Sequence, residues 1–100
     1  MNIKRSYAVD TVLTAERVCQ LLTNGKVNNL PITVGKALGI AQDSAGTVML
    51  KGISKGHVGL TTGSSYYYDV NGVITTSNLG IFVGVAISAT EILIPNYIID

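Results

Sequence analysis

The few side chains of this sequence that could do chemistry are scattered along the chain. The one histidine, His57, follows Lys55-Gly56 with no carboxylate or cysteine near it in sequence. We expect it to be a solvated loop side chain rather than a base or ligand. The one cysteine, Cys19, is flanked by apolar residues, a pattern typical of an inert buried thiol. The residues therefore predict no nucleophile–base pair.

The acidic residues form no recognisable catalytic pair or metal set. They lie mostly at predicted turns and chain ends, so neither a glycosidase-like carboxylate pair nor metal-ligand spacing can be argued. They are Asp10, Glu16, Asp43, Asp69, Glu91 and Asp100. The Gly-rich stretch 52–63 lacks the Gly-Lys-Ser/Thr ending of a phosphate loop, and its glycines fit turns better. We predict that the protein is not an enzyme and uses no cofactor or metal.

The composition points to a chain that associates. Of the 100 residues 47% are hydrophobic and only 13% are charged, about half the usual charged share. Small domains bury a low fraction of their surface, so association through this apolar surface is favoured over a compact monomeric barrel. A net charge of +1 gives no footprint for nucleic acid. We expect copies of the same chain as partners, and neither nucleic acid nor a membrane.

Targeting and disulfide signals are also missing from the sequence as read. A basic start at Lys4-Arg5 is followed by polar residues that break any signal-peptide apolar region. A single cysteine excludes an internal disulfide framework. We therefore expect synthesis in the cytosol.

The positions that could contact partners must be held by strands. In the second half, alternation and turn residues predict four strands, joined first by an Asn71-Gly72 hairpin turn. Both central residues of such a turn take a positive φ. The predicted strands are Ser65–Val70, Val73–Ser77, Ile81–Ser88 and Glu91–Ile94.

The first half predicts a similar series of strands. The stretch Thr14–Leu22 also fits a short capped helix, but the Asn24-Gly25 turn favours a strand. The predicted strands are Arg17–Leu22, Lys26–Leu30, Lys36–Gln42 and Thr47–Ser54. Residues 1–10 are expected to be an edge strand or arm, and the apolar residues 95–100 a tail that docks, for example on a neighbouring subunit.

The two halves look like copies of one unit. A shift of 47 residues places Asn24-Gly25 on Asn71-Gly72, and after a gap Gly39 falls on Gly84. A first unit of residues 11–50 and a second of residues 51–94 then share one domain of residues 1–100. The two-residue strand period predicts an inward set of Cys19, Leu21, Tyr66 and Tyr68 and an outward pair of Gln20 and Tyr67. The predicted fold class is all-β, a small β-barrel or tight sandwich of about eight short strands, with the barrel preferred.

Several short motifs resemble the β-modules of tailed-bacteriophage virion proteins. The resembling pattern is a Leu-Thr-x-Gly turn, a Tyr-Tyr strand, a Gly hairpin with Ile-Thr-Thr, a Val-Gly-x-Ala strand and a final apolar strand. In this chain these are Leu60–Gly63, Tyr66–Tyr68, Gly72–Thr76, Val83–Ala86 and Ile92–Ile94. The first half is similar to the small barrel of head decoration (capsid cement) proteins. Thr62 departs from the pattern, which commonly has Pro there.

The resemblance implies a structural role. It implies a decoration protein, a homotrimer seated on the major capsid protein at the outer surface of the virion head, which stabilises the shell by adding contacts. The alternative is a tail-fibre or baseplate module that contacts host glycans, for which Tyr67 is the candidate exposed ring. The candidate interface residues, taken from the arm, the Tyr strand and the tail, are Ile3, Arg5, Tyr7, Tyr67, Tyr97, Ile98 and Ile99.

Overall fold

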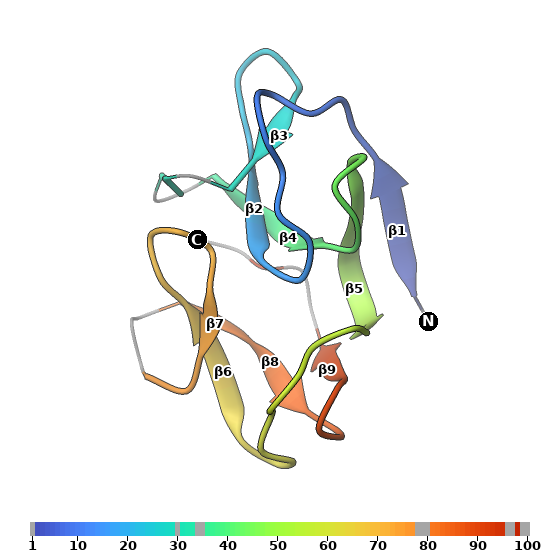
Figure 1. Ribbon diagram of the computed structural model, residues 1–100, viewed down its shortest axis with the longest axis vertical. Coiled ribbons are helices and arrows are strands. Elements are labelled where there is room, and N and C mark those ends of the chain that lie inside the picture. Colours follow the sequence, from blue (N-terminus) through green and yellow to red (C-terminus); the bar gives the residue numbers. More distant parts are fainter. Residues whose placement is uncertain (1, 30, 34–35, 78–80, 96–97, 99–100) are drawn as a thin grey trace.

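A computed structural model of the chain describes residues 2–29, 31–33, 36–77, 81–95 and 98. The described residues form an all-β fold of nine short strands without a helix (Figure 1). The strands are β1 (Ile3–Ser6), β2 (Val18–Leu21), β3 (Val27–Asn28), β4 (Ala37–Ala41), β5 (Thr47–Ser54), β6 (Ser65–Tyr68), β7 (Ile74–Thr75), β8 (Phe82–Ala86) and β9 (Ile92–Ile94). The predicted all-β class is confirmed, and the stretch from residue 14 to 22 holds a strand.

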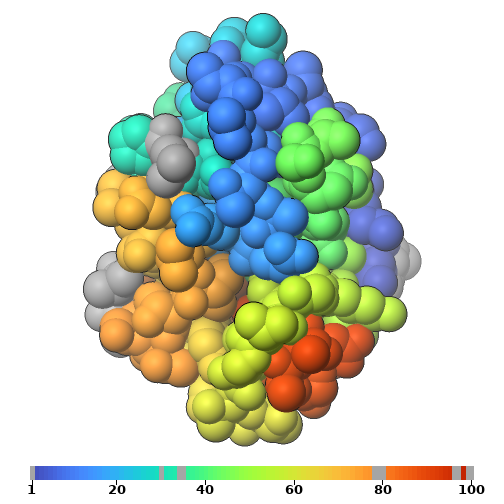
Figure 2. All heavy atoms as spheres, viewed as in Figure 1, coloured from blue at the N-terminus to red at the C-terminus, as the bar shows by residue number. Residues whose placement is uncertain are grey.

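The strands make one curled sheet that bends through both halves of the chain. Its order is β3-β2-β4-β5-β9-β8-β6-β7, with β1 added beside β5, and each of these pairings is antiparallel. The long strand β5 belongs to both halves, because its first part pairs with β4 and its last part with β9. Figure 2 shows the first half mostly in the upper part of the molecule and the second half mostly in the lower part. The predicted N-terminal edge strand is β1.

The hydrogen-bonded registers repeat from the first unit to the second. In the first hairpin Gln20 pairs with Asn28 and Leu21 with Val27. In the second, Tyr67 pairs with Thr75 and Tyr68 with Ile74. Each residue of the second hairpin stands at the position predicted by the shift of 47.

The other pairings of the two units correspond in the same way. Cys19 lies opposite Gly39 and Tyr66 lies opposite Gly84, and a register irregularity follows at the same step in both units. In the next pairing, Ile40 pairs with Met49 and Val85 with Leu93. The units therefore share strand order, register and irregularity.

Both hairpin turns differ from the predicted geometry. Only Gly25 (φ +81°) and Gly72 (φ +78°) adopt a left-handed conformation there, since Thr11 and Glu16 are the only non-glycine residues with positive φ in the described part. The N–H of Gly72 donates to the Asp69 carbonyl oxygen at 2.8 Å, and the Asp69 carboxylate accepts from two further N–H groups. The expected pair of left-handed residues is wrong because both loops have three residues rather than two: the Leu22 and Asp69 N–H groups donate to the Lys26 and Val73 carbonyl oxygens, and in such a loop only the glycine needs positive φ.

Three buried clusters hold the sheet together. One lies inside the first unit and contains Leu13, Cys19, Val27, Ala41, Val48 and Leu50. Its counterpart inside the second unit contains Tyr66, Ala86 and Ile92, with Leu60 and Ile74 packed against it. The largest cluster joins the units and contains Val18, Ile32, Ile40, Met49, Tyr68, Val83, Ile94 and Ile98. The contact between the units is therefore itself a hydrophobic core.

The predicted facing of the side chains holds for the tyrosine strand and fails at Gln20. Tyr66 and Tyr68 are buried and Tyr67 is partly exposed, as alternation requires. Gln20 was expected to face outward and is buried. Its amide donates to Asn28 Oδ1 at 2.7 Å and to the Pro31 carbonyl at 2.6 Å, and accepts from Thr33 N–H at 2.8 Å. The segment after β3 covers Gln20 and satisfies its polar atoms, so burial costs little.

Candidate interaction surface

A row of side chains crosses four strands of the second unit on its exposed side. The registers place Ile53 of β5 beside Leu93 of β9, Leu93 beside Val85 of β8, and Val85 beside Ser65 of β6. Leu93 is 37% exposed, and Ile53 and Val85 are partly exposed. Such cross-strand neighbours lie about 5 Å apart. The sheet therefore presents a continuous apolar strip to its surroundings.

An aromatic pair lies at one end of the same strands. Tyr67 on β6 and Phe82 on β8 are register partners, and their rings meet edge to face with centroids 6.1 Å apart. Phe82 is 41% exposed. Edge-to-face pairs are favourable in themselves, so the two rings hold each other in place at the surface.

The interface residues predicted on the N-terminal arm lie on and after β1. Ile3 and Tyr7 are half-buried and pack against the inner cluster of the first unit, whereas Arg5 is exposed. The Tyr7 N–H donates to the Gly46 carbonyl oxygen at 2.9 Å. The arm is thus part of the sheet of its own chain, and Arg5 is its accessible side chain.

The predicted tail residues divide between the core and the part that is not described. Ile98 is 5% exposed and belongs to the cluster that joins the units. Ile98 therefore docks on the chain's own core and offers no surface to a partner. Tyr97 and Ile99 lie outside the described residues.

His57 is not the solvated side chain that the sequence predicts. It is 6% exposed, and its Nε2 lies 2.8 Å from the Ser54 hydroxyl oxygen. The Gln42 amide donates to the same hydroxyl at 3.0 Å. Burial lowers the pKa of the His57 ring, which keeps the ring neutral. These hydrogen bonds connect Gln42, Ser54 and His57. Because Ser54 is wholly buried, its hydroxyl is not accessible as a nucleophile.

Two other titratable side chains, Cys19 and Asp43, have shifted pKa values. Cys19 is buried, as predicted, and burial raises the pKa of its thiol to about 12. The Asp43 carboxylate accepts hydrogen bonds from Thr47 and Ala45 N–H, and these lower its pKa. Among the described residues no group of three or more His, Cys, Asp or Glu side chains could hold a metal ion.

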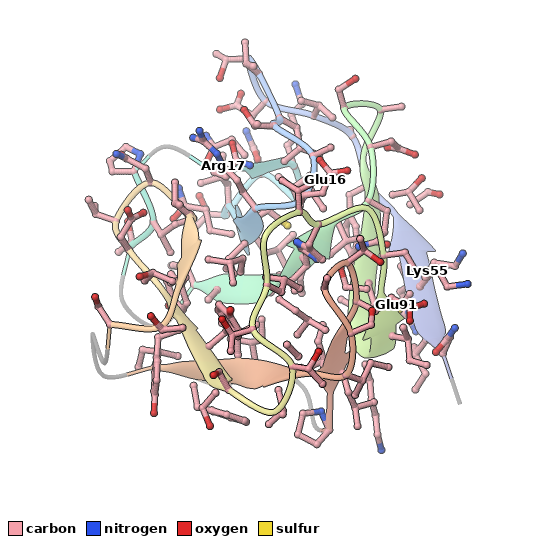
Figure 3. All side chains as sticks on the ribbon, turned by 60° about the horizontal axis from the view of Figure 1, so that its bottom comes forward. Glu16, Arg17, Lys55 and Glu91 are labelled. Carbon is pink, nitrogen blue, oxygen red and sulfur yellow. The ribbon has the colours of Figure 1, made fainter. Side chains whose placement is uncertain are left out.

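A shallow pocket of about 260 Å³ lies where the two units meet, beside the loop after β5. Figure 3 shows Glu16 and Arg17 next to this loop, with Lys55 and Glu91 at its start. Glu16 Oε1 lies close to Gly56, because a Cβ added to Gly56 would be 2.7 Å from this oxygen. Glu16, Arg17 and His57 are the charged or titratable residues among those lining the pocket. None of the described residues lining the pocket is a serine, threonine or cysteine.

Sequence reasoning missed Val85, Leu93 and Phe82 as surface residues. All three lie in strands that are apolar on both faces. In such strands the two-residue period separates the side chains into two faces but does not tell which face is buried. The repeat does not supply the missing signal, because equivalent positions in two packed units need not have equal burial.

Comparison with known proteins adds no relative. No family model, curated protein or solved structure matches the chain. Among the described residues there is no helix long and apolar enough to cross a membrane.

Proposed function

We propose that the chain is a structural virion protein, a bacteriophage capsid decoration protein that binds the outer surface of the head shell and stabilises it. The observation that carries this proposal is the exposed apolar surface of the second unit, made of the strip Ile53–Leu93–Val85 and the ring of Phe82 beside Tyr67. Apolar side chains gathered on one face mark a surface that is covered in the working state. The proposed location on the phage head comes from the resemblance of the sequence motifs to decoration proteins.

The mechanism is mass action on an assembled lattice. A protein that binds only the assembled shell lowers the free energy of that state and not of the released subunits. The major capsid protein is the proposed partner, and copies of the chain are the second partner. Only 13% of the residues of the chain are charged, which suits a contact driven by apolar burial rather than by long-range attraction.

The test uses heads assembled without the chain. Adding the purified protein should give saturable co-sedimentation with the heads and raise the temperature at which they release DNA. The variant Phe82→Ser should weaken binding about tenfold or more if the exposed apolar side chains form the contact. Val12→Ser is the matched control, because Val12 is 66% exposed in the loop between β1 and β2. Heads that neither bind the protein nor gain stability would overturn the proposal.

One observation favours a second function, a tail-fibre or baseplate module that binds host glycans. The half-exposed ring of Tyr67 stands beside Phe82 and pairs with Thr75 on β7. An aromatic face with nearby hydroxyls can stack on a sugar and bond to it. Binding on a glycan array that disappears in Tyr67→Ala would favour this function, and an array without signal would remove it.

A further inference from the structure

The contact between the two units is made by different faces of the same repeated structure. The first unit contributes Val18, Ile40 and Met49, which we call face A of the first unit. The second unit contributes Tyr68, Val83 and Ile94, which we call face B of the second unit. These two sets are not equivalent in the repeat, so the contact is heterologous, as in a head-to-tail assembly.

Each unit therefore also has the face that the contact does not use. The registers place Ser65, Val85 and Leu93 of the second unit at the positions of Val18, Ile40 and Met49, and they form face A of the second unit. Leu21 and Leu38 of the first unit stand at the positions of Tyr68 and Val83, and these two partly exposed side chains form face B of the first unit. Leu50, at the position of Ile94, is already buried in the inner cluster of the first unit.

Burial differs sharply between equivalent positions. Met49 is 2% exposed in the contact, whereas its counterpart Leu93 is 37% exposed. Ile40 is completely buried and its counterpart Val85 is partly exposed. On the other face, Val83 is buried whereas its counterpart Leu38 is partly exposed. Val85 and Leu93 on one unused face, and Leu21 and Leu38 on the other, are apolar at positions that form a core elsewhere in the same chain.

The unused face B is also hollow. A pocket of about 310 Å³ is lined by Leu21, Leu22, Lys36, Ala37 and Leu38. In the second unit, the equivalent positions Tyr68 and Val83 pack in the cluster that holds face A of the first unit. The pocket in the first unit thus lies where the second unit is filled by a packed neighbour.

We propose that a second copy of this chain docks face A of its second unit into face B of the first unit, repeating between chains the contact made within each chain. Leu93 and Val85 of one copy then cover Leu38 and Leu21 of the next. Because the two faces differ, a dimer still has one free face A and one free face B. Association continues until a ring closes or a fibre grows.

The test blocks each face separately and then mixes the variants. Leu93→Glu blocks face A, and Leu38→Glu blocks face B; light scattering over a concentration range gives the mass of each. The wild-type protein should form species larger than a dimer, and each variant alone should be a monomer. An equimolar mixture should form a dimer, because one intact face A remains for one intact face B. Val12→Glu, outside both faces, should keep the wild-type mass.

Folding is checked separately, since Leu38 packs partly against the inner cluster of the first unit. Far-UV circular dichroism and the melting transition must match the wild type; if Leu38→Glu fails, Leu22→Glu at the pocket replaces it. A wild-type protein that is monomeric at all concentrations would overturn the inference. So would wild-type mass in Leu93→Glu, or a mixture of folded variants that stays monomeric.

The inference deepens the self-association in the proposed function and rests on that function only for its setting. A monomer that still binds and stabilises heads would disprove the head-to-tail contact and leave the decoration role standing. The predicted assembly without head binding would disprove the decoration role and leave the contact standing.

Discussion

Gly39 and Gly84 occupy the same position in the two units, and each lies against the backbone carbonyl of an adjacent strand. A Cβ on Gly39 would overlap the carbonyl oxygen of Met49, and a Cβ on Gly84 would overlap that of Leu93. Met49 and Leu93 are themselves equivalent. The repeat thus conserves a close backbone approach that only glycine allows.

Alanine at either glycine should destabilise the protein substantially. Because backbone atoms cannot move aside cheaply, Gly39→Ala and Gly84→Ala should each cost about 1–3 kcal/mol or more of unfolding free energy, measured by urea denaturation. Gly59→Ala is the control: its φ is +70° but nothing lies within 4 Å of an added Cβ, so it should cost only about 1–2 kcal/mol of backbone strain. Equal losses at Gly59 and at the two packed glycines would contradict the steric explanation.

Replacing Glu16 with glycine should leave the stability of the protein unchanged or raise it slightly. Its φ is +63°, and the equivalent Gly63 has φ +87°. Their N–H groups donate to the equivalent carbonyls of Ala41 and Ala86 at 2.8 and 2.7 Å. Since a left-handed conformation costs a non-glycine residue about 1–2 kcal/mol, Glu16→Gly should be neutral to slightly stabilising. Gly63→Ala should lose about 1 kcal/mol or more, and thermal melting of both variants checks the pair.

Stability should fall as the pH is lowered from 7 to 5, because of His57. Burial lowers the pKa of its ring below the ordinary value of 6.5, so the unfolded chain binds a proton before the folded protein does. The stabilisation is fully present above pH 6.5 and is lost as the pH falls through the lowered pKa. Urea midpoints at pH 7 and 5 measure this loss.

The control for the pH experiment is His57→Gln, which keeps a polar group near Ser54 but does not titrate. Its stability should change less between pH 7 and 5 than that of the wild type. The Asp43 carboxylate is distinguished by range, because its hydrogen bonds lower its pKa and it therefore titrates below pH 5. A variant with the full wild-type pH dependence would show that His57 is not the responsible group.

Neighbouring tyrosines should respond very differently to truncation. Tyr68 lies in the cluster that joins the units, so Tyr68→Ala should cost about 3–5 kcal/mol, as for other large core residues. Tyr67 makes mainly the edge contact with Phe82, so Tyr67→Ala should cost about 0.5–1.5 kcal/mol. Melting of the two variants under identical conditions checks this, and equal losses would contradict the assigned faces.

The strands, their repeat and the buried sides of Cys19 and Tyr66 could be predicted from the sequence. The alternation around Tyr66–Tyr68, the two Asn-Gly turns and the paired glycines are local signals, and each depends on residues close in the chain. The burial of Cys19 followed from its apolar neighbours in the same strand. Gln20 and His57 were misplaced because the groups that bury and satisfy them come from other segments.

The way in which the two units meet could not be predicted from the sequence and became visible only in the packed fold. Met49 and Leu93 are both apolar and stand at the same register position, so no pattern could tell that one is buried and the other exposed. The difference arises because two copies of one unit packed by unlike faces must leave one face of each uncovered. Local sequence specifies which side chains a strand carries, and the packing of the units decides which of them remain at the surface.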